Sequence, residues 1–92
     1  KIMEWKDATT YSRDQKERKQ TAWELKLPSL RIWIGCGHRN YLGEFVMHCY
    51  QLGFDTHALN LKADTDIEVV KEKAIRLCRM VANKFVAELN NL

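Results

Sequence analysis

The chain has 92 residues, of which 46% are hydrophobic and 29% are charged. These values are typical of a globular protein, so they argue against a disordered or fibrous chain, and the length fits one domain, residues 1–92, with a single core. The formal net charge of +3 permits a nucleic acid as partner without requiring one. No apolar run approaches the roughly 18 residues of a membrane-spanning helix, which predicts a soluble protein.

Residues 1–20 predict an N-terminal strand followed by a charged loop. The segment 1–13 is rich in β-forming residues and has no helical periodicity. Residues 14–19 read DQKERK, with charges of both signs and no apolar residue to bury. Such a run is typical of a solvated connection between two strands.

Residues 21–52 predict a β-meander. Between Thr21 and Leu27 the polar and apolar residues alternate, which is the period of a half-buried strand. Pro28 and Ser29 interrupt this pattern, and it resumes at Leu30, so a tight hairpin is expected. After a glycine-containing turn at 35–43, residues 44–52 predict a further strand, and residues 53–64 are expected to form a turn and a connection. The side chains expected in the core are Trp23, Leu25, Leu27, Leu30, Ile32, Ile34, Phe45, Met47 and Cys49.

Residues 65–91 predict one long helix. Thr65 and Glu68 have the spacing of a capping box, in which each side chain satisfies a free backbone N–H of the first turn. Apolar residues recur at steps of three and four, which predicts a stripe that packs on the sheet. The members of this stripe are Ile67, Val70, Ala74, Leu77, Cys78, Val81, Phe85 and Leu89.

The helix is expected to extend beyond its sheet and to expose a second apolar flank. It would be roughly 39 Å long, whereas strands of about seven residues span only some 23 Å. Ile75, Ala82 and Val86 lie beside the main stripe, and Leu92 follows at the end. We therefore interpret Ile75, Ala82, Val86 and Leu92 as the interface of a homodimer.

The predicted fold is an α+β two-layer structure. It consists of an antiparallel meander of three to four strands with one long C-terminal helix packed on one face. The other face of the sheet would remain open. On the parity of the strands it would carry Lys26, Arg31, Trp33, His48 and Tyr50, and Arg39 of the following turn would lie nearby.

The cysteines and histidines suggest two kinds of chemical site, a metal site and a catalytic pair. Cys36 and His38 are two residues apart and could join His48 or Cys49 in a zinc site, or Cys36 could act as a nucleophile beside a histidine. His48 and Cys49 are adjacent in a predicted strand, so they must point to opposite faces. We therefore expect no metal, no cofactor and no enzymatic activity. Three cysteines at irregular spacing fit reduced thiols in a cytoplasmic protein.

Two functional classes remain for the open face. The first is a small protein-interaction module, such as an accessory or inhibitor protein, in which aromatic side chains anchor a protein partner or a second copy. The alternative is a nucleic-acid-binding module that stacks bases on the same aromatic side chains. The basic residues there are few, and Glu24 lies among them, which favours the protein-interaction reading. No membrane association and no small-molecule substrate are expected.

Overall fold

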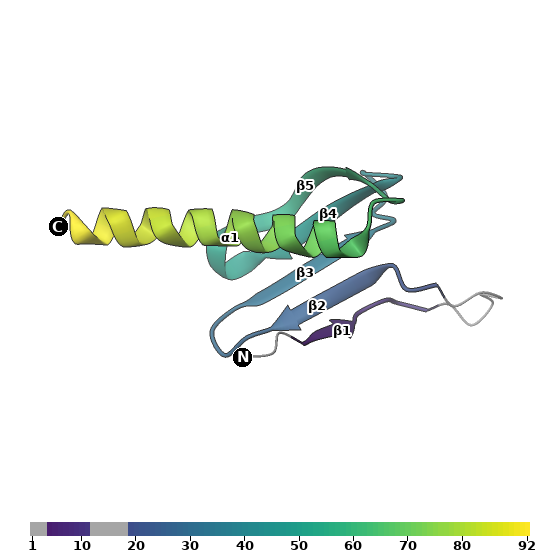
Figure 1. The fold of residues 1–92 in the computed structure, drawn as a ribbon, viewed down its shortest axis with the longest axis horizontal. Helices are drawn as coiled ribbons and strands as arrows, with labels where there is room; N and C mark the ends of the chain where they lie inside the picture. The colour runs from purple at the N-terminus through teal and green to yellow at the C-terminus, as the bar shows by residue number, and fades with distance from the viewer. Residues whose placement is uncertain (1–3, 12–18) are drawn as a thin grey trace.

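The computed structural model of the chain describes residues 4–11 and 19–92. Figure 1 shows one twisted sheet with one long helix against it. The strands are β1 (Trp5–Asp7), β2 (Ala22–Lys26), β3 (Arg31–Cys36), β4 (Glu44–Cys49) and β5 (Phe54–Lys62). A 3₁₀ turn, η1 (Tyr50–Leu52), joins β4 to β5, and the helix is α1 (Ile67–Asn90). The strands are antiparallel and lie in the order β1-β2-β3-β4-β5, which confirms the predicted α+β meander with a C-terminal helix.

The alternating pattern of the central strands builds the core. Leu25 pairs with Ile32 across β2 and β3, and Ile34 pairs with Met47 across β3 and β4, so their side chains lie on one face. All four are at most 3% exposed. The backbone N–H of Leu27 donates to the carbonyl of Leu30 at 2.8 Å, which closes the hairpin predicted at Pro28 and Ser29. The charged connection predicted at residues 14–19 falls almost entirely outside the described residues.

The fifth strand is a correction to the sequence-based reading of residues 53–64. The exposure of its side chains alternates from Phe54 to Ala58 and again from Leu59 to Lys62, but the phase changes between Ala58 and Leu59. Thr56 and Asn60 also have positive φ angles, 52° and 58°. The register between β4 and β5 also shifts twice, between Glu44 and Val46 and between Met47 and Cys49. Irregularities of this kind offset the period-2 pattern, so β5 does not read as a strand in the sequence.

The start of the helix differs by one residue from the predicted capping box. The N-cap is Asp66, whose carboxylate accepts a hydrogen bond from the backbone N–H of Glu68 at 3.0 Å. Thr65 is therefore not the capping residue. Glu68 consequently lies within the first turn, where its side chain pairs with Lys71 at 3.0 Å.

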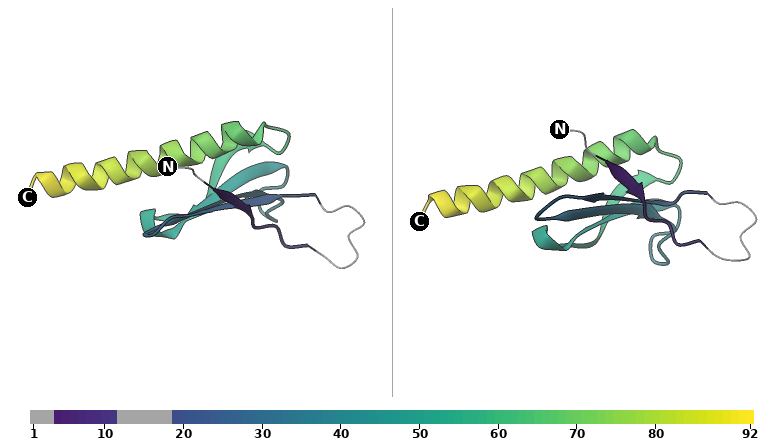
Figure 2. Two further views of the ribbon diagram at one scale, coloured as in Figure 1. Left: turned by 60° about the horizontal axis from the view of Figure 1, so that its bottom comes forward. Right: turned by 90° about the horizontal axis from the view of Figure 1, so that it is seen from below.

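The helix covers only part of the sheet and only with its first half. It packs on β3, β4 and β5, while β1 and β2 lie beside it (Figure 1). Val70, Ala74 and Cys78 are buried against the sheet as predicted. The expectation that the stripe stays buried to its end is wrong, since Phe85 is 44% exposed and Leu89 is 66% exposed. Figure 2 shows the reason, because the C-terminal half of α1 extends past the end of the sheet, as the length comparison predicted.

Candidate interaction surfaces

The first candidate surface is the face of the sheet opposite α1. Glu24, Trp33 and His48 occupy successive positions across β2, β3 and β4, and Lys26 lies opposite Arg31. Their strand neighbours belong to the core under α1, so these side chains point to the other face, as the parity predicted. We call this surface the open face.

Aromatic rings form a row on the open face. The rings of Trp33 and His48 are 4.7 Å apart, and the ring of Tyr50 stacks on His48 at 5.6 Å with an interplanar angle of 25°. Tyr50 belongs to η1 rather than to β4, and it is 62% exposed. The structure therefore brings together three of the residues predicted for this surface. Arg39 is exposed in the turn after β3, outside this row.

Gly35 determines how Trp33 lies on the strand. A Cβ atom added at Gly35 would be 2.4 Å from the Trp33 indole, which means that the ring covers the glycine directly. Gly35 is buried and pairs with Ala22 on one side and Val46 on the other, so a row of small or apolar residues runs beneath this part of the face. Trp33 therefore lies along the sheet and is half-buried instead of projecting into solvent.

An ion pair reduces the positive charge of the open face. The Nε atom of Arg31 lies 3.3 Å from a carboxylate oxygen of Glu24. The backbone N–H of Arg31 also donates to the side chain of Gln51 at 3.3 Å. Lys26 and Arg39 are both exposed. The surface is consequently mixed in charge rather than a cationic stripe.

Burial lowers the pKa of His48 below its ordinary value of 6.5, although the nearby carboxylate of Asp55 acts in the opposite direction. The Nδ1 atom of His48 accepts a hydrogen bond from the backbone N–H of Thr56 at 3.0 Å. A protonated imidazole cannot accept this bond, because both of its nitrogens then carry hydrogen. The contact therefore joins β4 to β5 only while His48 is neutral.

We expect the free energy of unfolding to fall as the pH is lowered from 7 towards 5. Because the pKa of His48 is lower in the folded protein than in the unfolded chain, the unfolded chain binds a proton first. The contribution of His48 to the free energy of unfolding is thus fully present above pH 6.5. It is lost as the pH falls through the pKa that His48 has in the folded protein. Urea unfolding at several pH values measures this. In the His48→Asn variant the amide oxygen can still accept from Thr56, and the fall in this pH range should be smaller.

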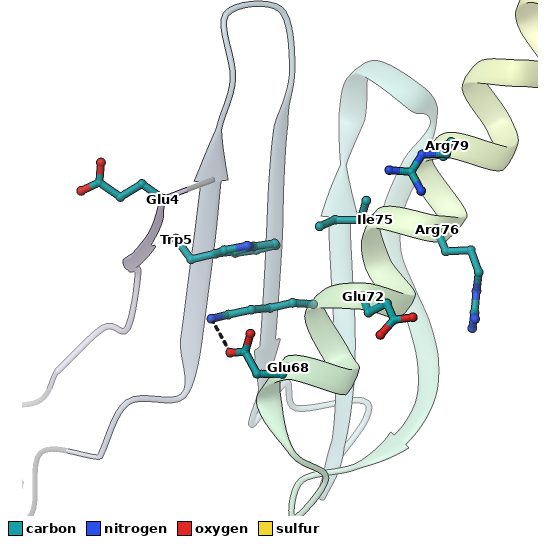
Figure 3. A pocket seen from close by; sticks show the side chains of 8 residues that line it. Glu4, Trp5, Glu68, Glu72, Ile75, Arg76 and Arg79 are labelled. Carbon is teal, nitrogen blue, oxygen red and sulfur yellow. Dashed lines mark hydrogen bonds and ion pairs between the residues drawn. The ribbon is translucent and has the colours of Figure 1, made fainter. Parts of the chain in front are cut away.

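The second candidate surface is a groove between α1 and β1, which Figure 3 shows from close by. Trp5 of β1 and Ile75 of α1 face each other across it, and the Nζ atom of Lys71 lies 5.8 Å from the Trp5 ring. The groove is open to solvent, and its volume is about 740 Å³. We call it the Trp5 groove. Its remaining lining residues are Glu4, Glu68, Glu72, Arg76 and Arg79.

The third candidate surface is the projecting half of α1, residues 81–90, with Leu92 after it. Phe85, Leu89 and Leu92 line a shallow apolar hollow together with Glu88. Val86 is 53% exposed and Leu92 is fully exposed. The residues predicted for a dimer interface lie along one flank of α1, which starts at Ile75 in the Trp5 groove and passes Ala82 and Val86. Sequence reasoning assigned Phe85 and Leu89 to the core and left Trp5 without a role.

The structure separates the residues considered for metal binding or catalysis. Cys49 is buried in the core, while His48 lies on the open face. Cys36 packs on the core side opposite Phe45, and His38 lies in the turn, where its ring faces Tyr41 at 5.6 Å. Within residues 4–11 and 19–92, no three His, Cys, Asp or Glu side chains form a cluster that could hold a metal ion.

Two of the three thiols, Cys36 and Cys78, are held in the protonated form by their surroundings. Burial raises the pKa of Cys36, and it raises the pKa of Cys78 to about 12, with Cys49 beside it adding to the effect. A thiol with a raised pKa is less often ionised at neutral pH, and the thiolate is the reactive form.

In the described part of the chain, no helix combines the length and the apolar character that crossing a membrane requires. Comparison of the chain with models of protein families, with curated proteins and with solved structures found no match.

Proposed function

We propose that this chain is a small non-enzymatic protein-interaction module that works as a homodimer, with the projecting half of α1 as its main contact surface. The observation that carries the proposal is the exposure of Phe85, Val86 and Leu89 on the projecting half of α1, and of Leu92 after it, where no strand formed by residues 4–11 and 19–92 lies beneath the helix. Contiguous apolar surface on a soluble domain typically marks a site of association. A second copy, which carries the same surface, can cover it in a two-fold dimer.

Helix length also supports association through this half. An isolated helical segment of ten residues is marginal in water, because helix stability comes mainly from packing of one apolar face. Residues 81–90 continue α1 without such packing on the sheet. A partner that covers Phe85 and Leu89 would supply the missing contact.

Binding of a nucleic acid to the open face is the alternative, and it has less support. The Trp33 indole lies over Gly35 and is half-buried, so its ring packs on the sheet. Arg31 is already paired with Glu24. Affinity for nucleic acid depends mainly on basic groups that neutralise phosphates, and the open face offers few of them. These features of the open face therefore favour the protein-interaction module over the nucleic-acid alternative.

A pair of glutamate substitutions tests the homodimer. Leu89→Glu places a charge in the apolar surface and should weaken dimerisation at least tenfold, because the charge would have to be desolvated. Ala87→Glu is the matched control, since residue 87 is also exposed but lies about 200° around the helix from residue 89. We expect its dimerisation to equal that of the unmodified chain. Sedimentation equilibrium over a range of protein concentrations measures all three, and a chain that stays monomeric at high concentration would contradict the proposal.

A further inference from the structure

Two surfaces of the chain are complementary but cannot meet within one molecule. The apolar stripe of α1 continues past the sheet, so Phe85 and Leu89 form an apolar surface that none of the described strands covers. On the same face of the sheet, Trp5 and Trp23 of β1 and β2 are only partly buried, because α1 packs on β3, β4 and β5 instead. Within the described residues, the projecting half of α1 therefore packs on no strand, and β1 and β2 are not covered by α1.

We infer that the Trp5 groove receives the projecting half of α1 from a second copy, and that the second copy receives the first in the same way. The inference rests on the proposed homodimer and specifies how its two chains bind. In this exchange the two helices lie side by side and antiparallel across β1 and β2. The Phe85 side of each projecting half then covers Trp5 and Trp23 of the partner.

The spacing of apolar residues along α1 gives the register of the exchange. Ile75, Ala82 and Leu89 are separated by seven residues, about two turns, so they lie on the same side of the helix. With the two-fold axis at Ala82, Leu89 of one copy lies against Ile75 of the other. The small side chain of Ala82 allows the two helices to approach closely where they cross.

The charges at the two ends of this contact are also complementary. The last turn of α1 has no basic residue, so the partial negative charge of its C-terminal carbonyl groups is not offset within the helix. In the register above, the partner's helix end at Asn91 comes within about one turn of Lys71. Lys71 lies over the Trp5 ring at the wall of the groove, where its ammonium group pairs with Glu68 at 3.0 Å and has further N–H groups that can interact with this helix end.

The buried area distinguishes this exchange from a contact between the two projecting ends alone. Half the circumference of a ten-residue helix corresponds to roughly 300 Å² of accessible surface, given the usual helix dimensions. The exchange buries this area twice and the smaller surface of the groove twice, which amounts to about 1,000 Å² in total and is close to the lower limit for specific interfaces. An end-to-end contact would bury only about half as much, which is the range of weak crystal-packing contacts.

Pairwise cross-linking tests the inference. In a Cys36→Ser background, which removes the thiol that is not fully buried, Ile75→Cys and Leu89→Cys are prepared separately, mixed and treated with a short bismaleimide. We expect a covalent dimer in the mixture and little with either variant alone. In the proposed register the two copies of residue 75 are about 21 Å apart along the helices, as are the two copies of residue 89.

Each other outcome identifies what fails. Efficient cross-linking of Leu89→Cys alone would indicate an end-to-end contact, which overturns the groove assignment and leaves the homodimer intact. A dimer that shows no cross-link in the mixture would also overturn the groove assignment. A monomeric chain would overturn both proposals. If Ile75→Cys fails to fold, Glu72→Cys and Leu92→Cys give the same test, because both positions are exposed and are symmetric about Ala82.

Discussion

Phe45→Ala is expected to lower the free energy of unfolding by about 3 to 5 kcal/mol, because it removes a large buried side chain and leaves a cavity. Phe45 is 2% exposed and lies in the core that β2, β3, β4 and α1 share. Its ring is 6.2 Å from that of Trp23, so the substitution also removes an aromatic contact. Urea denaturation followed by circular dichroism measures the loss.

Phe85→Ala is the matched control, since it is the same substitution on the projecting half of α1. Phe85 is 44% exposed, so we expect a loss below about 1 kcal/mol. The comparison must be made at a protein concentration where the chain is monomeric. Association would stabilise the unmodified chain through Phe85, and the loss caused by Phe85→Ala would then approach that caused by Phe45→Ala. Equal losses at the two positions would contradict the assignment of Phe85 to an interaction surface.

Gly35→Ala is expected to lower the free energy of unfolding by about 1 to 3 kcal/mol, although alanine is usually preferred to glycine within a strand. The new Cβ atom would lie 2.4 Å from the Trp33 indole, so the ring must leave its place over the strand. Its contact with His48 at 4.7 Å would be lost as well. Unfolding curves give the energy, and the tryptophan emission of the folded variant should shift towards that of a more exposed indole.

A double substitution separates this clash from any other effect of the new methyl group. In a Trp33→Ala background nothing occupies the space over Gly35 that the indole fills in the unmodified chain. There we expect Gly35→Ala to be neutral or to stabilise the protein by up to about 1 kcal/mol. If Gly35→Ala is equally destabilising in both backgrounds, the indole is not the cause.

The central part of the fold could be predicted because its pattern is regular. From Thr21 to Ile34 polar and apolar residues alternate around one hairpin, and the structure places Leu25, Ile32 and Ile34 in the core as expected. Leu27, which the same pattern placed in the core, lies at the hairpin and is 40% exposed. The same reasoning fails for β5, where positive φ angles at Thr56 and Asn60 accompany shifts in register. Alternation of polar and apolar residues identifies a strand only where the backbone keeps the two-residue repeat of a regular strand.

The candidate surfaces could be predicted in part, for a related reason. Parity along the strands places Trp33 and His48 on one face without any knowledge of their contacts. It does not indicate that the indole lies over Gly35, since that contact runs along one strand between two residues on the same face. Nor does it indicate which strands the helix covers, and the Trp5 groove depends on this choice.

The overhang of α1 also affects how the chain moves through solution. The molecule measures 55 × 27 × 21 Å and its radius of gyration is 14.6 Å, whereas a compact domain of this length would have about 12 Å. Such a rod meets more friction than a sphere of equal mass, so a single copy elutes early from a gel-filtration column and resembles a heavier particle. Side-by-side exchange of helices widens the rod and also lengthens it to about 80 Å, because the two-fold axis at Ala82 lies about 15 Å from one end of the 55 Å molecule. An end-to-end pair would instead be longer and would experience more friction.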